Sequence, residues 1–176
     1  MVDAAPDSSL FSVRVQADPF DVAAEMADLS RGRTDVGALV TFTGLCRADL
    51  APSGPPSPAV QQSGAAPLAA LVLEHYPGMA EEEMLRLVAE ARARWPLTGA
   101  RIIHRHGRLE PGDLIVLVVT ASAHREAAFS AAAFLMDWLK TSAPFWKKEE
   151  RANGGDWVAA KATDDAAADR WRGGGS

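Results

Sequence analysis

Cationic side chains gather in one part of this sequence. Eight lysines and arginines and three histidines lie between residues 101 and 151. They are Arg101, Arg105, Arg108, Arg125, Lys140, Lys147, Lys148 and Arg151, with His104, His106 and His124. The whole chain has a formal net charge of -5, which argues against the broad basic stripe of a nucleic-acid-binding protein. A cationic cluster in an acidic chain indicates a site for a small anion.

The pair His124-Arg125 lies where an expected strand gives way to an expected helix. Backbone N–H groups at a helix N-terminus attract anions, and an arginine fork can bind phosphate or carboxylate with two hydrogen bonds. The alternative is an ordinary helix start with solvated side chains.

Two lysines have apolar neighbours. Lys140 follows Met136 by four residues near the end of that helix, and Lys147 lies beyond a proline, next to Phe145 and Trp146. A partly desolvated lysine can accept a proton or act as a nucleophile. Either lysine could instead extend its charged end into solvent from a buried stem.

The cysteine and a histidine pair allow two further kinds of chemistry. Cys46 is the single cysteine, so it forms no internal disulfide, and Arg47 beside it would lower the pKa of its thiol. A cysteine after a strand is more often inert. His104 and His106 alternate along an expected strand and could bind a metal, but no third ligand accompanies them, and a solvated basic strand is the alternative.

Common signatures are absent from the sequence. It has no glycine-rich phosphate loop, dinucleotide fingerprint, C-x-x-C pair or nucleophile elbow. Its longest aliphatic run, residues 114–119, is far shorter than the roughly 20 residues that span a bilayer. We therefore expect a soluble, cytoplasmic protein.

The length of 176 residues is typical of one domain. Hydrophobic periodicity and turn residues predict strands at 11–16, 36–43, 68–76, 100–106 and 114–121, helices at 18–29, 80–94, 124–142 and 164–171, and a hairpin of 145–149 with 157–161. Asp18 is the expected cap of the first helix. The helix at 124–142 should bury Phe129, Ala132, Ala133, Met136 and Leu139. Interleaved helices and hairpins predict an α+β class with a mixed or antiparallel sheet.

Two segments lack periodicity. Residues 50–67 are rich in Pro, Ser, Gly, Gln and Ala and are expected to form a flexible loop. Residues 173–176 have the composition of a flexible tail, which leaves 1–172 as one domain.

Several motifs occur together in one order. They are Val40 to Gly44 with Arg47, Leu73 to Met79, Ile103 to Arg105 with Gly107 and Pro111 to Asp113, Ser122 to Arg125, and Asp137 to Lys140 followed by Ala143 to Glu149. Over residues 10–171 the chain resembles the catalytic large subunit of molybdopterin synthase. The departures are the long 50–67 segment, His106 and the tail.

The resemblance implies a single domain with an α/β hammerhead-type fold, a homodimer, and a small ubiquitin-like subunit at each end of a 2:2 heterotetramer. The small subunit's C-terminal thiocarboxylate would supply sulfur to cyclic pyranopterin monophosphate, forming the molybdopterin dithiolene. The chain would thus be a sulfurtransferase of molybdenum cofactor biosynthesis, needing no metal, cofactor, nucleic acid or membrane.

The resemblance also implies the site residues. Lys140 and Lys147 match catalytic positions. The matched substrate-binding positions are Arg47, His124, Arg125, Glu149 and Lys161. Two alternatives remain: a non-catalytic relative that binds the small subunit, and a phosphate-ester enzyme with His124 as base.

Overall fold

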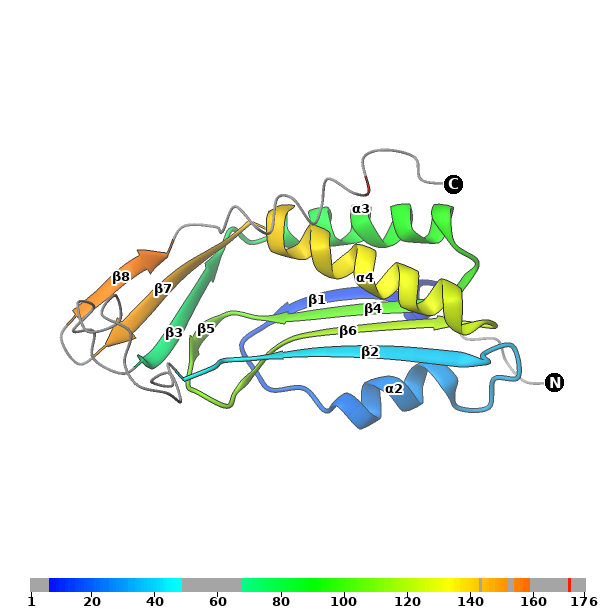
Figure 1. The fold of residues 1–176 in the computed structure, drawn as a ribbon, viewed down its shortest axis with the longest axis horizontal. Coiled ribbons are helices and arrows are strands. Elements are labelled where there is room, and N and C mark those ends of the chain that lie inside the picture. Colours follow the sequence, from blue (N-terminus) through cyan, green and yellow to red (C-terminus); the bar gives the residue numbers. More distant parts are fainter. Residues whose placement is uncertain (1–6, 49–67, 143, 152–153, 159–170, 172–176) are drawn as a thin grey trace, which may run out of the picture.

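The computed structural model describes residues 7–48, 68–142, 144–151, 154–158 and 171. Its elements form two four-stranded sheets, with helices on both faces of the first (Figure 1). A short helix, α1 (Asp7–Leu10), precedes the first strand. The predicted loop at 50–67, the tail at 173–176 and residues 164–170 of the last predicted helix lie outside the described residues.

The first sheet has the strand order β1-β4-β6-β2. Its members are β1 (Phe11–Gln16), β4 (Leu97–Arg105), β6 (Leu114–Ser122) and β2 (Ala38–Leu45). β1 pairs with β4 in parallel, whereas β4–β6 and β6–β2 are antiparallel. The sheet is therefore mixed, as predicted, and β4 is a central strand with neighbours on both sides.

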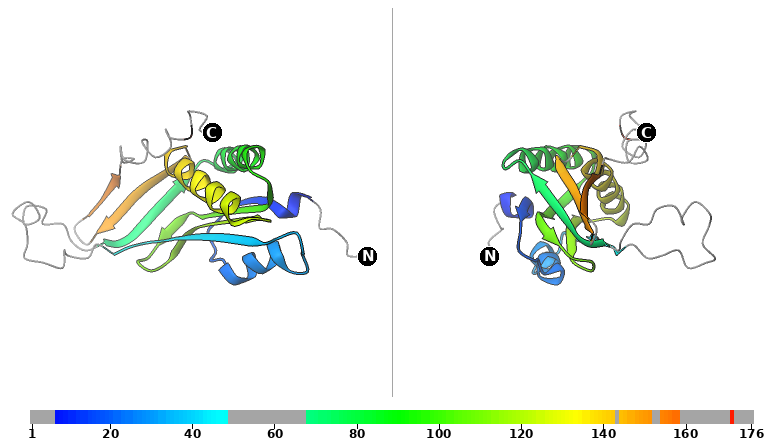
Figure 2. Two further views of the ribbon diagram at one scale, coloured as in Figure 1. Left: turned by 45° about the vertical axis from the view of Figure 1, so that its right-hand side comes forward. Right: turned by 90° about the vertical axis from the view of Figure 1, so that its left-hand side faces the viewer.

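Helices cover both faces of this sheet (Figure 2). α3 (Met79–Arg94) and α4 (Arg125–Ser142) pack on one face through a core that includes Leu87, Phe134 and Ile102. α2 (Val22–Ser30) packs on the other face, where Leu29 contacts a cluster that includes Leu117. The first sheet is therefore the middle of three layers, between α2 on one face and α3 and α4 on the other.

The second sheet has the order β5-β3-β7-β8 and lies at one end of the first. Its strands are β5 (Gly107–Leu109), β3 (Leu68–His75), β7 (Phe145–Arg151) and β8 (Gly154–Val158). All pairings in it are antiparallel. Because α4 leads into β7, the second sheet begins where the helix ends.

The predicted fold class is confirmed, and so is the first predicted hairpin, since β4 pairs with β6. β7 pairs with β8 as predicted for the second hairpin, but β8 begins at Gly154, within the predicted turn, and residues 159–161 lie outside the described residues. The predicted cap of the first helix is wrong. The cap of α2 is Asp21, whose carboxylate accepts hydrogen bonds from the backbone of Ala23 and Ala24, and not Asp18. The amide of Gln16 donates to the carbonyl of Asp18, which holds that residue in the bend before the helix.

The predicted buried face of α4 is only partly correct. Leu139 and Ala132 are buried, but Ala133 is exposed and Phe129 is 62% exposed. α4 lies over β6 and the edge strand β2. One side of the helix therefore extends beyond the sheet. None of the helices in the described ranges is long and apolar enough to cross a membrane.

Candidate functional site

Part of the cationic cluster predicted from the sequence is structural. Arg101 is buried and donates to the carboxylate of Glu25 on α2 at 2.5 Å. Arg105 is also buried and donates to the carbonyl oxygens of Ala17 and Leu114. These two arginines connect secondary-structure elements, so they do not belong to a ligand site.

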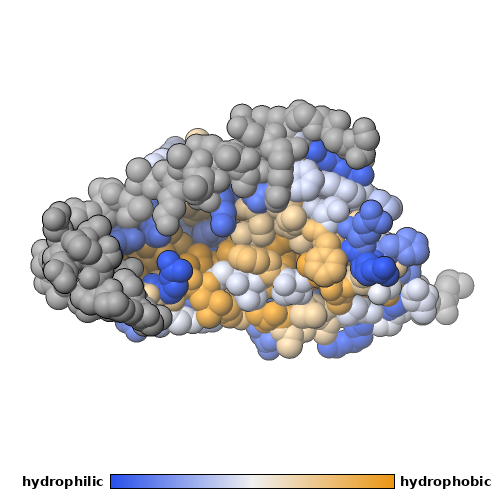
Figure 3. Space-filling model, viewed as in Figure 1, coloured by the Kyte–Doolittle hydropathy of each residue, from blue (hydrophilic) through white to orange (hydrophobic). Residues whose placement is uncertain are grey.

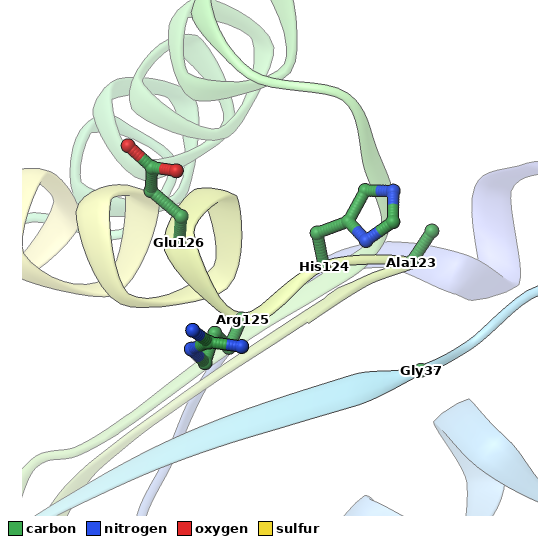
Figure 4. Close-up of a pocket in the computed structure, with 5 residues that line it drawn as sticks. All are labelled: Gly37, Ala123, His124, Arg125 and Glu126. Carbon is green, nitrogen blue, oxygen red and sulfur yellow. The ribbon is translucent and has the colours of Figure 1, made fainter.

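His124 and Arg125 line a pocket of about 430 Å³ at the beginning of α4 (Figure 4). Gly37, Ala123 and Glu126 complete its lining. The Arg125 guanidinium lies on the β2 side of the helix, while the carboxylate of Glu126 points to the other side. His124 and Arg125 are exposed, and the first N–H groups of the 18-residue helix add a positive partial charge. The pocket can therefore bind an anion such as phosphate.

Gly37 is a pocket residue that the sequence reasoning missed. Its N–H donates to the carbonyl of Ser122 at 3.0 Å, and a Cβ at this position would collide with the carbonyl oxygen of Ala123. Glycine is therefore needed for the close approach of the chain before β2 to the chain before α4. Strand pairing between these segments is the only signal that could have identified it.

The lysines lie at the opposite end of α4. Lys140 is exposed in the last turn of the helix, and Lys147 is partly buried in β7. Lys147 shares one face of β7 with Glu149 and Arg151, because alternate residues of a strand point the same way. The Glu149 carboxylate lies 3.8 Å from the Lys147 ammonium and 2.6 Å from the Arg151 guanidinium. Glu149 therefore orients the side chains of Lys147 and Arg151. Lys161 lies outside the described residues.

Arg47 belongs to the lysine end of the molecule. It is exposed directly after Cys46, and Cys46 packs in a cluster with Leu73. Leu73 is the cross-strand partner of Lys147 in the β3–β7 pair. The strand β2 therefore separates Arg47 from Gly37 and the anion pocket.

Cys46 is buried, with 3% of its surface exposed, and its sulfur lies 3.8 Å from the carbonyl oxygen of Leu109. A buried thiol among leucines is a poor nucleophile because burial disfavours the thiolate. We expect Cys46→Ala to keep the activity that the resemblance implies within about two-fold of wild type and to lower stability by about 1 kcal/mol through the lost packing. Activity assays and chemical denaturation check this; a persulfide trapped on Cys46 during turnover would contradict it.

The two ends of α4 cannot contact one small ligand within a single chain. Arg125 and Lys140 are 15 positions apart in the helix, which corresponds to about 22 Å along its axis. They nevertheless share one helical face with Phe129, Ala133 and Met136, which follow each other at spacings of three and four. The structure thus places the predicted site residues in two groups, an anion end and a lysine end.

An apolar surface connects these two ends, and we call it the α4–β2 surface. It contains Phe129, Ala133 and Met136 of α4 and Phe42 of β2, of which Phe42 is 40% exposed. Figure 3 shows apolar side chains gathered over this part of the molecule, with hydrophilic groups on either side. Exposed apolar patches of this kind are typical of protein interfaces.

The predicted histidine pair does not form a solvated strand. His104 stacks on Phe145 with ring centroids 3.8 Å apart, and His106, which follows the end of β4, lies 4.6 Å from His75. Among the described residues, no three His, Cys, Asp or Glu side chains are grouped to hold a metal ion. The two histidines instead join an aromatic cluster between the two sheets.

Burial lowers the pKa of His104 from 6.5 to about 4, and repulsion from His75 adds to this, although a hydrogen bond to the Arg105 carbonyl acts in the opposite direction. Between these pH values the unfolded chain binds a proton at this position that the folded chain does not. We therefore expect His104 to reduce the free energy of unfolding, by at most about 3 kcal/mol, as the pH falls through this window.

Denaturant titrations of wild type and His104→Phe between these pH values check the expectation. The variant should lose part of the pH dependence, by about one proton. Identical slopes in the two proteins would show that His104 does not titrate in this way.

The two-sheet α+β fold, with an anion pocket and a lysine end on one helix, defines a domain suited to group transfer to an anionic substrate. Comparison with known proteins identifies the family within this class. The family described as "MoaE protein" matches residues 15–142, and the chain belongs to this family.

Relatives and solved structures agree with this assignment. A molybdopterin synthase catalytic subunit from Rhizobium meliloti is 59% identical over 162 residues, which is 91% of this chain and 95% of the relative. One from Mesorhizobium japonicum is 58% identical over 163 residues, covering 92% and 93%. The structure of a molybdopterin biosynthesis MoaE protein from Burkholderia ambifaria superposes with a TM-score of 0.72 at 45% identity, covering 92% of this chain and 97% of that one.

Proposed function

We propose that this chain is the catalytic subunit of a molybdopterin synthase. It transfers sulfur from the thiocarboxylated C-terminus of a small ubiquitin-like subunit to cyclic pyranopterin monophosphate, and two transfers complete the dithiolene. The observation that carries the proposal is the presence, in a chain of this family, of an anion pocket at the start of α4 and of two lysines, one in the last turn of α4 and one in the strand that follows it. A cytoplasmic location stays a prediction.

The charges of the site suit this chemistry. The substrate carries a phosphate, which the Arg125 guanidinium, His124 and the N-terminus of α4 can bind. In each transfer the thiocarboxylate sulfur bonds to a carbon of the pterin as a carbon–oxygen bond at that carbon breaks, and the departing oxygen stays on the phosphate or leaves as water. Water then breaks the acyl carbon–sulfur bond and supplies the oxygen of the resulting carboxylate. Lys140 and Lys147 can stabilise the negative charge that develops and donate a proton. Arg47, which is exposed after the end of β2, is the residue that we assign to binding of the carboxylate-like tail.

One substrate molecule can meet both ends of α4 only when two copies of the chain assemble. The α4–β2 surface lies between Arg125 and Lys140, so a two-fold axis through its centre would set two α4 helices antiparallel. Arg125 of one copy would then face Lys140 of the other. Burial of Phe129 and Phe42 in this contact would stabilise the dimer, at roughly 25 cal/mol per Å² of apolar area. Each site thus combines the anion end of one copy with the lysine end of its partner.

The small subunit approaches the lysine end from the second sheet. Trp146 of β7 is 52% exposed and points to the face opposite Lys147. Phe145, by contrast, is occupied by its stack on His104, so only Trp146 of this predicted aromatic segment is available to a partner. The partner's Gly-Gly tail can enter as an extended chain because glycine allows close approach of the backbone to the lysines.

Reconstitution tests the proposal. The purified chain, a thiocarboxylated small subunit and cyclic pyranopterin monophosphate are mixed, and the dithiolene is measured as its oxidised fluorescent derivative. We expect product to form with two thiocarboxylates consumed for each dithiolene. The control uses a small subunit with an ordinary carboxylate, which should give no product. Tight binding of the small subunit without any dithiolene would instead support the non-catalytic binding module.

A further inference from the structure

Four aromatic rings form a cluster where the two sheets meet. The rings of His104 and Phe145 stack at 3.8 Å between centroids and 17° between planes. His75 lies tilted, 6.0 Å from Phe145 and 4.6 Å from His106. His75 ends β3, His104 precedes the last residue of β4, and Phe145 begins β7. The cluster therefore joins three strands of two different sheets.

Phe145 occupies a special place in the chain. It lies between Lys140, in the last turn of α4, and Lys147, two residues into β7. Phe145 and Lys147 point to the same face of β7 because they are two residues apart. A ring that holds Phe145 therefore helps to fix the start of β7, together with the pairing of this strand with β3.

His104 is itself held firmly. Its ring nitrogen Nδ1 lies 2.9 Å from the carbonyl oxygen of Arg105, which orients the imidazole. Arg105 is fixed in turn, because its guanidinium donates to the carbonyl oxygens of Ala17 and Leu114. β4 is paired on both sides, with β1 and β6. The His104 ring is thus attached to an inner strand of the first sheet.

We propose that His104 is a positioning residue for sulfur transfer: its ring holds Phe145 and so sets Lys147 relative to Lys140. His104 acts through Phe145 and not on the substrate. The proposal rests on the proposed function, since it concerns the two lysines of that site. A misplacement of about 1 Å at a catalytic group can cost on the order of 100-fold in rate, so a lost stack should be visible in turnover.

The test compares His104→Ala, His104→Phe and Phe145→Leu in the reconstituted assembly. His104→Ala should lower kcat by roughly ten-fold or more while KM for the pterin stays within about two-fold, because the residues that line the anion pocket do not include His104 or Phe145 and are left in place. His104→Phe keeps an aromatic ring for stacking and should recover kcat to within about three-fold of wild type. Phe145→Leu should match His104→Ala, and the double variant His104→Ala/Phe145→Leu should be no worse than either, since both remove one interaction.

His106→Ala is the matched control, because His106 contacts His75 and no contact of its ring with Phe145 is seen within the described cluster. It should keep kcat within about two-fold. A His104→Phe variant as inactive as His104→Ala, or a His104→Ala variant with normal kcat, would overturn the proposal. Should His104→Ala fail to fold, Phe145→Leu takes its place, and a Phe145→Leu variant with normal kcat would then overturn the proposal. Failure of the wild-type assembly to make any dithiolene would count against the proposed function instead.

Discussion

Replacing either Lys140 or Lys147 by alanine should lower kcat for dithiolene formation by on the order of 100-fold, the usual effect of removing one group that stabilises developing charge. Both ammonium groups are accessible, since Lys140 is exposed and the Lys147 side chain is 43% exposed. Their loss leaves the main core intact, so the variants should unfold within about 0.5 kcal/mol of wild type. Single-turnover rates and denaturant titrations check both statements.

Lys148→Ala is the matched control for Lys147→Ala. Lys148 is the next residue of β7, and its side chain points to the opposite face of the strand. It should keep kcat within about two-fold, because it carries the same charge at nearly the same position but does not face the site. If Lys148→Ala and Lys147→Ala are equally impaired, the effect comes from net charge or from the strand, and Lys147 has no special role.

The fold could be predicted from the sequence where a single hydrophobic pattern dominates a segment. Phe11, Val13 and Val15 alternate with polar residues, and β1 has the predicted bounds. β5 was not predicted because its three residues are too few for a period, and it exists only through pairing with β3. Phe129 was predicted to be buried because it lies on an apolar helical stripe, but burial depends on what the helix covers, which the pattern cannot show.

The residue types of the site could be predicted from the sequence, but their arrangement in space could not. Charge and helix position identified Arg125 and Lys140, and their separation follows from the rise of a helix alone. The sequence could not show that Arg101 forms a buried ion pair with Glu25, since these residues are far apart in the chain. Nor could it show that His104 stacks on Phe145, because that contact needs the second sheet to be in place.

The second large effect is expected from the proposal that each site is shared between two copies of the chain. His124→Ala/Arg125→Ala removes the anion end, and Lys140→Ala/Lys147→Ala removes the lysine end, so each homodimer should be nearly inactive. A heterodimer of the two variants, co-expressed with different tags and purified through both, should contain one intact site and one site lacking all four side chains. It should therefore show about half of the wild-type activity per dimer.

The reciprocal heterodimer pairs a wild-type chain with a chain carrying all four substitutions. Here each shared site would lack one of its two ends, so this heterodimer should be nearly inactive although half of its chains are normal.

Dithiolene formation by these two purified heterodimers, measured side by side with thiocarboxylated small subunit and cyclic pyranopterin monophosphate, is the most direct test of how the site is built. The account predicts about half activity when the two ends are damaged on different chains and almost none when both are damaged on the same chain. The opposite result, with activity only in the heterodimer that retains one fully wild-type chain, would place the whole site within a single chain and contradict it.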